Sequence, residues 1–82
     1  MKTLQERLKF ARKEAFLTQA QLSVRSGLSQ STIAQIESGR NSGTRYADLL
    51  AKALGVSLDW LLSGEGPIST NPLFSPPRRR AM

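Results

Sequence analysis

Residues Gln19–Ile36, QAQLSVRSGLSQSTIAQI, contain two short helical patterns separated by a glycine, Gly27. Leu22 gives the first pattern an apolar face, and Ile33 and Ile36 give one to the second. Glycine readily adopts the left-handed backbone conformation that commonly ends a helix. The stretch therefore predicts two short helices joined by a tight turn and packed against a common core.

The rest of the chain predicts more helices and no strand. Thr3 with Glu6, and Thr18 with Gln21, have the form of capping boxes, which begin helices. Residues 39–44, GRNSGT, have the composition of a loop. The predicted helices span Leu4–Ala15, the segment from the Thr18 cap to Gly27, Gln30–Ser38 capped by Ser29, Arg45–Leu54, and Leu58–Leu62. The expected fold class is all-α, a compact five-helix bundle.

The predicted helices need a shared core, because the two central ones are shorter than the roughly 12–15 residues at which an isolated helix becomes marginally stable. Replacing Ile33 or Ile36 by Ala is expected to cost about 2–5 kcal/mol. The expected core residues are Leu8, Leu22, Ile33, Ile36, Leu50, Leu54, Trp60 and Leu61.

Length and composition limit the domain organisation. Eighty-two residues allow one small domain with a modest core. All four prolines follow Gly64, which predicts a folded domain over residues 1–63 and a flexible Pro/Arg-rich tail over residues 64–82. A vector-derived or truncated end is the alternative interpretation of this tail.

Several classes of function are excluded by residues that the chain lacks. It has no cysteine and no histidine, which excludes disulfides, cysteine-rich metal sites and histidine acid-base chemistry. No nucleophile with an adjacent base is visible, so we expect no enzyme activity, no cofactor and no metal. No apolar run approaches the roughly 18 residues that cross a bilayer, and the charged start MKTLQERLKF is unlike a signal peptide.

The charge of the chain indicates an anionic partner. Twelve basic and six acidic residues give a formal charge of +6. Residues 1–63 contain nine of the basic and five of the acidic residues, so the excess is not confined to the tail. A basic excess of this size in so short a chain is typical of nucleic-acid binding.

Several blocks along the chain have a characteristic mutual spacing, namely Arg12, LTQAQL at 17–22, Gly27, LSQSTIAQIESGR at 28–40 and LAKALGVSLDWLL at 50–62. Together these blocks resemble the Cro and phage-repressor type (XRE-like) helix-turn-helix family, in particular the DNA-binding domains of lambdoid phage repressors. The resemblance covers about residues 3–63. It implies a lambda-repressor-like fold and a transcriptional regulator, in particular a repressor that binds a palindromic operator in double-stranded DNA as a homodimer. It also implies a cytoplasmic, nucleoid-associated protein of bacterial or phage origin.

The resemblance assigns base contacts to the helix expected at Gln30–Ser38. Family members contact bases with the first, second and sixth residues of this helix, here Gln30, Ser31 and Gln35. A glutamine offers the donor and acceptor that adenine presents in the major groove, whereas serine discriminates less. Thr32 is expected to touch a phosphate or a thymine methyl group.

DNA-backbone contacts are expected on either side of this helix. The resemblance implies that Gln19 lies beside a phosphate and braces Gln30. The loop after the helix offers amides taken to be free, small polar side chains and two guanidinium groups, which suit phosphate binding. Arg45 also matches a position that reaches a minor groove. The backbone candidates are Gln19, Arg40, Asn41, Ser42, Gly43 and Arg45.

The same resemblance implies a structural ion pair between Arg12 and Glu37. The sequence departs from the family at three positions. Phe16 replaces a glycine at the end of the first helix and predicts a differently shaped end. Ser23 replaces an alanine but is small enough to keep the helices close. Phe10 replaces a polar residue and, with Val24, suggests an apolar partner surface.

Two further interactions are expected from the C-terminal part. Leu58, Leu61 and Leu62 supply apolar surface for a dimer contact, while core packing is the expected role of Trp60.

An alternative function is an antitoxin or adaptor whose tail binds a protein partner through Leu73 and Phe74. RNA is a third candidate target, although the aromatic stacking surfaces common in RNA-binding modules are missing.

Overall fold

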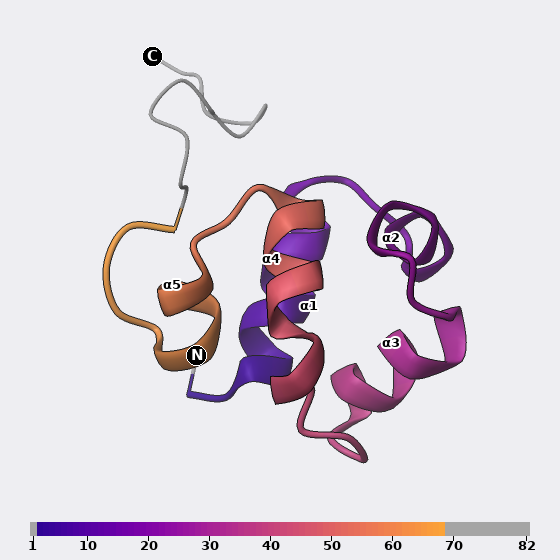
Figure 1. Ribbon diagram of the computed structural model, residues 1–82, viewed down its shortest axis with the longest axis horizontal. Helices are drawn as coiled ribbons and strands as arrows, with labels where there is room; N and C mark the ends of the chain where they lie inside the picture. The colour runs from indigo at the N-terminus through magenta and orange to yellow at the C-terminus, as the bar shows by residue number, and fades with distance from the viewer. Residues whose placement is uncertain (1, 69–82) are drawn as a thin grey trace.

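The computed structural model describes residues 2–68, which form an all-α domain (Figure 1). Three of the sequence-based boundaries change, the first because the helix expected at Leu4–Ala15 ends at Glu14. The helix expected at Arg45–Leu54 begins only at Ala47, because a 3-10 turn precedes it, and the last helix extends to Ser63. The elements are α1 (Leu4–Glu14), α2 (Gln19–Ser26), α3 (Gln30–Ser38), the 3-10 turn η1 (Thr44–Tyr46), α4 (Ala47–Leu54) and α5 (Leu58–Ser63).

Both predicted capping boxes are confirmed. The Thr3 hydroxyl accepts a hydrogen bond from the backbone amide of Glu6, and the Glu6 carboxylate accepts from the amides of Thr3 and Lys2. These backbone hydrogen bonds lower the pKa of Glu6 below its ordinary value. Thr18 and Gln21 form the equivalent pair at the start of α2. The side chains therefore satisfy amides that each helix leaves unpaired at its start.

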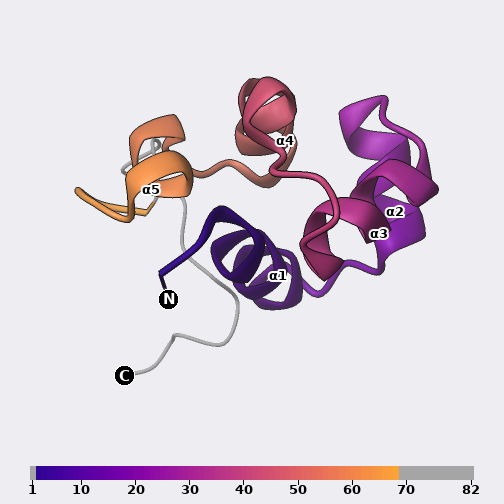
Figure 2. The same ribbon diagram turned by 90° about the horizontal axis from the view of Figure 1, so that it is seen from below.

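The arrangement of the helices separates two ends of the domain. α2 and α3 lie together at one end, α5 lies at the other, and α1 and α4 lie between them (Figures 1 and 2). All eight predicted core residues are buried, so that prediction is confirmed. Further buried residues complete the core where the helices approach closely, namely Ala11, Ala47, Ala51 and Val56.

The chain leaves α1 through a left-handed residue that is not glycine. Phe16 has a φ of 60°, and its side chain is 64% exposed. The expectation of a differently shaped helix end is therefore wrong for the backbone, which takes the left-handed conformation that a glycine would favour. The amide of Leu17 donates to the carbonyl of Arg12, so the turn stays hydrogen-bonded. A bulky residue in this conformation is strained.

Arg7 is a buried charged residue that sequence analysis did not predict. Its side chain is 4% exposed, and its guanidinium donates to the carbonyls of Leu61 and Leu62 at 2.8 and 2.7 Å. Those carbonyls lie in the last turn of α5, where a cation is favoured by the helix dipole. Arg7 thus fixes the end of α5 to α1.

Candidate nucleic-acid interface

The start of α3 is fixed by a cap and a glycine turn. α2 ends at Gly27, whose φ of 80° reverses the chain. The Ser29 hydroxyl accepts from the amide of Thr32 at 3.0 Å and lies 2.8 Å from the Thr32 hydroxyl. Thr32 is partly buried, and its amide and hydroxyl are engaged in this cap. Less of its side chain is therefore accessible to DNA than the sequence prediction assumed.

α3 presents opposite faces to the core and to solvent. Ile33 and Ile36 have no exposed surface, whereas Gln30, Ser31 and Gln35 are all exposed. The structure thus brings the three residues predicted to contact bases onto one outward surface. A helix anchored in this way holds its exposed side chains at a fixed angle to the domain, as a helix that enters a major groove must.

A second predicted feature, the pair between Arg12 and Glu37, joins α1 to the end of α3. The guanidinium donates from Nε to one carboxylate oxygen at 2.7 Å and from a terminal nitrogen to the other at 3.0 Å. Arg12 also donates to the carbonyl of Leu17 at 2.8 Å. The side chains of Arg12 and Glu37 are 12% and 3% exposed, so the bidentate pair is largely shielded from water.

Gln19 extends this network instead of contacting Gln30. Its side-chain amide donates to Glu37 at 3.1 Å, which differs from the bracing contact that the resemblance implied. Burial raises the pKa of Glu37, but the hydrogen bonds from Arg12 and Gln19 outweigh it and lower the pKa below its ordinary value. The ionised carboxylate therefore holds together α1, the start of α2 and the end of α3.

The loop after α3 folds back on the helix that it follows. The amides of Arg40 and Asn41 both donate to the carbonyl of Gln35, at 2.9 and 3.1 Å. The Asn41 side chain accepts from the amide of Gly43 at 2.9 Å. The expectation of free amides at these three positions is therefore wrong, because the loop uses them to close its own turns.

Gly43 is part of the core rather than the surface. It is buried with a φ of 78°, and a Cβ there would lie 2.7 Å from Cγ2 of Ile36 and 3.1 Å from Cδ2 of Leu4. Only glycine fits this close approach. Gly43 accordingly turns the loop onto Ile36 and offers no surface for a phosphate.

Two exposed arginines remain beside α3. Arg40 directly follows the helix end at Gly39, and the Arg45 guanidinium lies 5.5 Å from the centre of the Tyr46 ring. From α2 to η1, the sequence contains three arginines and one acid, Glu37, which is already paired with Arg12. The segment from α2 to η1 therefore has a net positive charge.

Ser23 and Ser26 fix the turn between α2 and α3, a role that sequence analysis did not predict. The Ser23 hydroxyl donates to the carbonyl of Leu28, and the Ser26 hydroxyl accepts from the amide of Leu28 at 3.2 Å. Ser23 thus adds a hydrogen bond that alanine could not make. Two serines shortly before the glycine turn were the available signal, since such hydroxyls often bond nearby backbone.

The remaining candidates separate into core and surface. Leu61 is fully buried and lies in the core, so the surface left for a dimer contact is Leu58 and Leu62, at 36% and 41% exposed. Phe10 packs against Trp60 with ring centres 6.3 Å apart and belongs to the edge of the core. Val24 is 84% exposed, so of the two residues predicted to form an apolar partner surface it is the one that lies open to solvent.

The residues predicted to make tail contacts, Leu73 and Phe74, lie outside the described residues. Within residues 2–68, no three potential ligand side chains gather in a way that would bind a metal. No helix in that range has the length and apolar character needed to cross a membrane.

Two short helices at a glycine turn, with exposed polar residues on the second, define a helix-turn-helix protein. The sequence profile of the helix-turn-helix family HTH_3 matches residues 8–61. The chain belongs to this family, which comprises Cro-like DNA-binding transcriptional regulators and not enzymes. The resemblance found in the sequence and the predicted fold class are both confirmed.

Relatives include regulators of mobile elements. The chain is 44% identical over 68 residues to the HTH-type transcriptional regulators for conjugative elements R391 of Providencia rettgeri and SXT of Vibrio cholerae. These matches cover 83% of this chain and 32% of each relative. PrtR of Pseudomonas aeruginosa is 45% identical over 60 residues, which is 73% of this chain and 23% of PrtR. The chain spans about a third of the length of the first two relatives.

The fold also matches a solved repressor structure. The crystal structure of the P22 c2 repressor in complex with synthetic operator 9T has a TM-score of 0.71 and 32% sequence identity to this chain. The match covers 79% of this chain and all of that one. The fold and the family thus agree on a DNA-binding domain.

Proposed function

We propose that the chain is the operator-binding part of a repressor and binds a palindromic site in double-stranded DNA as a dimer. The observation that carries this proposal is the outward face of α3. Gln30, Ser31 and Gln35 are exposed together while Ile33 and Ile36 anchor the opposite side. The similarity of this chain to the P22 c2 repressor, whose crystal structure contains a synthetic operator, supports the same role.

The contacts divide into two kinds. Gln30, Ser31 and Gln35 face the base edges of the major groove, where a glutamine can pair with the donor and acceptor of adenine. Arg40 and Arg45, helped by Ser42, bind phosphates on either side of the groove and set the position of α3 without selecting a sequence.

A dimer follows from the size of the recognition surface. One helix of nine residues contacts only a few base pairs, which gives too little selectivity in a genome. Two copies related by a two-fold axis double the number of base pairs that are read. Leu58 and Leu62 on α5 supply exposed apolar surface for the contact between copies.

Selection of bound oligonucleotides from a random pool tests the proposal directly. We expect an inverted repeat to be enriched, and a variant with Gln30, Ser31 and Gln35 all replaced by Ala to enrich no defined sequence. Placing the selected site across a promoter should lower transcription from it when the protein is present. Enrichment of single-stranded or unrelated sequences would contradict the proposal.

Cellular placement follows from this role. A protein that occupies an operator in a bacterium or its phage works in the cytoplasm, on the nucleoid. Fluorescence of a tagged chain should therefore overlap with stained DNA in the cell, and the triple variant should spread more evenly.

A further inference from the structure

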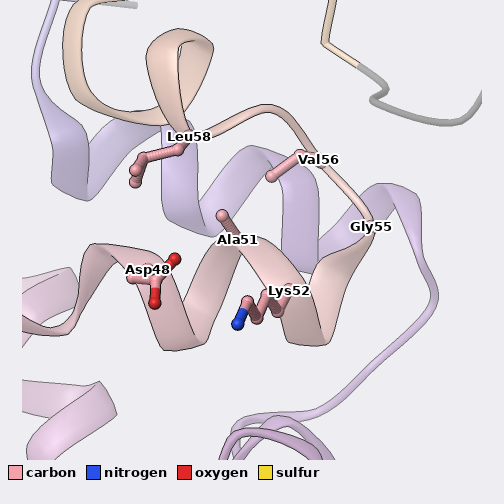
Figure 3. Close-up of a pocket in the computed structure, with 6 residues that line it drawn as sticks. All are labelled: Asp48, Ala51, Lys52, Gly55, Val56 and Leu58. Carbon is pink, nitrogen blue, oxygen red and sulfur yellow. The ribbon is translucent and has the colours of Figure 1, made fainter.

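A groove lies between α4 and the beginning of α5, at a distance from the face of α3. Ala51 points into it from α4, Val56 and Leu58 lie along its other wall, and α1 passes behind it (Figure 3). Its volume is about 370 Å³. The residues that line it are Asp48, Ala51, Lys52, Gly55, Val56 and Leu58. The groove is thus apolar between its walls, with two charged side chains on its α4 side.

The described chain ends beside this groove. The backbone amide of Ser57 donates to the carbonyl of Ile68. Ser57 lies between Val56 and Leu58, both of which line the groove. The segment after α5 therefore returns from the end of that helix to its beginning, and Ile68, the last described residue, lies next to the groove.

The sequence that follows offers an apolar pair within reach of the groove. Leu73 and Phe74 come five and six residues after Ile68. Five extended residues span at most about 17 Å, which is ample for a groove that borders the attachment point. Prolines at 72, 76 and 77 flank the pair and limit the backbone freedom that docking would remove.

Charge is complementary as well. Asp48 lines the groove and Asp59 lies in the first turn of α5, and both are exposed. Arg78, Arg79 and Arg80 begin four residues after Phe74. With Phe74 in the groove, these arginines come within reach of both carboxylates, while Lys52 is the one basic residue that lines the groove.

We propose that Leu73 and Phe74 dock into the groove between α4 and α5 of their own chain, with Arg78–Arg80 beside Asp48 and Asp59. The short connection favours this occupant over a second copy or another protein. A segment tethered by a few residues has an effective concentration in the millimolar range at its site. Docking holds the tail across the start of α5 and covers the side of Leu58 that lines the groove, so the contact between copies then depends mainly on Leu62, which lies outside the groove.

A spin label tests the proposal in the full chain. Because the sequence has no cysteine, Ser75→Cys provides a single attachment site next to the apolar pair. We expect the nitroxide to broaden the amide signals of Ala51, Val56 and Leu58 in NMR spectra. Signals of Val24, on α2 at the other end of the domain, should keep their intensity.

Two variants of the labelled chain provide matched comparisons. Leu73→Ser with Phe74→Ser should weaken the broadening of the groove signals, because an undocked tail still reaches the groove but spends less time there, whereas Thr70→Ala with Asn71→Ala should leave the broadening unchanged. Both pairs lie in the tail and leave the core of the domain unchanged. Intact groove signals in the labelled chain, or equal broadening in the two variants, would overturn the proposal.

A mixed sample separates docking within one chain from docking between copies. Isotope-labelled chains without the nitroxide are mixed with unlabelled chains that carry it. A dimer contact through α5 can itself bring a neighbour's nitroxide near the groove, so the same mixture is also made with nitroxide-labelled chains that carry Leu73→Ser and Phe74→Ser. We expect equal broadening of the groove signals in the two mixtures. Stronger broadening with the native tail would show that a second copy supplies the apolar pair, and the proposal of docking within one chain would be wrong.

Discussion

Gln30 and Arg40 are both exposed beside the same helix, but the proposed interface gives them different roles. Gln30→Ala removes a paired donor and acceptor, so we expect specific binding to weaken by about 1–3 kcal/mol and selectivity to relax at one base position. Arg40→Ala removes a phosphate contact and should weaken binding to all sequences similarly, with a salt slope smaller by about one. Binding titrations at several salt concentrations, on selected and scrambled sites, measure both effects. Equal loss of selectivity in the two variants would contradict this division of roles.

Gly43 shows that a residue in a polar loop can be fixed by the core. A Cβ at this position would lie 2.7 Å from Ile36 in a backbone conformation that other residues rarely adopt. We expect Gly43→Ala to lower the free energy of unfolding by about 2–5 kcal/mol, from backbone strain and overpacking together. Gly27→Ala is the matched control, because Gly27 has a φ of 80° but a Cβ there would meet no atom within 4 Å, and it should cost only about 1–2 kcal/mol. Equal losses in urea unfolding would show that the contact with Ile36 is unimportant.

Phe16 carries backbone strain without the burial that would offset it. Its φ is 60° and its side chain is 64% exposed. Substitution by glycine and by alanine removes the same aromatic ring, but only glycine relieves the left-handed strain. We therefore expect Phe16→Gly to be more stable than Phe16→Ala by about 1 kcal/mol in denaturant titrations. The reverse order would mean that residue 16 is not left-handed in solution.

At the scale of the helices, the pair between Arg12 and Glu37 holds α3 in position. Both side chains are largely buried, so removing either leaves the other without its main partner. We expect each single Ala variant to lose about 3–5 kcal/mol of stability, and the double variant to lose less than the sum by about 0.5–3 kcal/mol. Strictly additive losses of stability in denaturant titrations would show that Arg12 and Glu37 do not couple α1 to α3.

The same pair makes the stability of the fold depend on pH. The pKa of Glu37 is lower in the folded chain than its ordinary value of 4.5, so the ionised carboxylate stabilises the fold fully above that value. This contribution is lost as the pH falls through the lowered pKa and Glu37 takes up a proton. We expect the stability advantage of the native chain over Glu37→Gln to shrink as the pH falls below about 4.5. An advantage that stays constant from about pH 6 to about pH 3, a range that spans the ordinary pKa of glutamate, would contradict the role of the ionised form.

The helices could be predicted from sequence because their signals are local. The Thr3 and Thr18 boxes and the spacing of Ile33 and Ile36 lie within single elements. What could not be predicted depends on contacts between distant residues. Arg7 is buried because the carbonyls of Leu61 and Leu62, more than fifty residues away, come to lie over α1.

The candidate site shows the same limit. The outward positions of Gln30, Ser31 and Gln35 follow from helical spacing against Ile33 and Ile36. Other contacts depend on how the chain turns after α3. Gln19 donates to Glu37 and not to Gln30, and the loop amides donate to the carbonyl of Gln35 and the side chain of Asn41. Composition identifies such a loop but cannot show which of its amides already have partners.

For the molecule as a whole, a rigid domain and a symmetric dimer together set the geometry of the operator. Ile33, Ile36 and the Glu37 network fix α3 within each copy, so the distance between the two recognition helices depends on the dimer contact alone. We expect half-sites with centres about 34–36 Å apart, one helical turn of DNA. Inserting about five base pairs between them rotates one half-site to the far side of the duplex and should reduce binding to that of a single half-site. Gel-shift titrations with the native site, the insertion and an isolated half-site measure this, and tight binding to the insertion would contradict a dimer of fixed geometry.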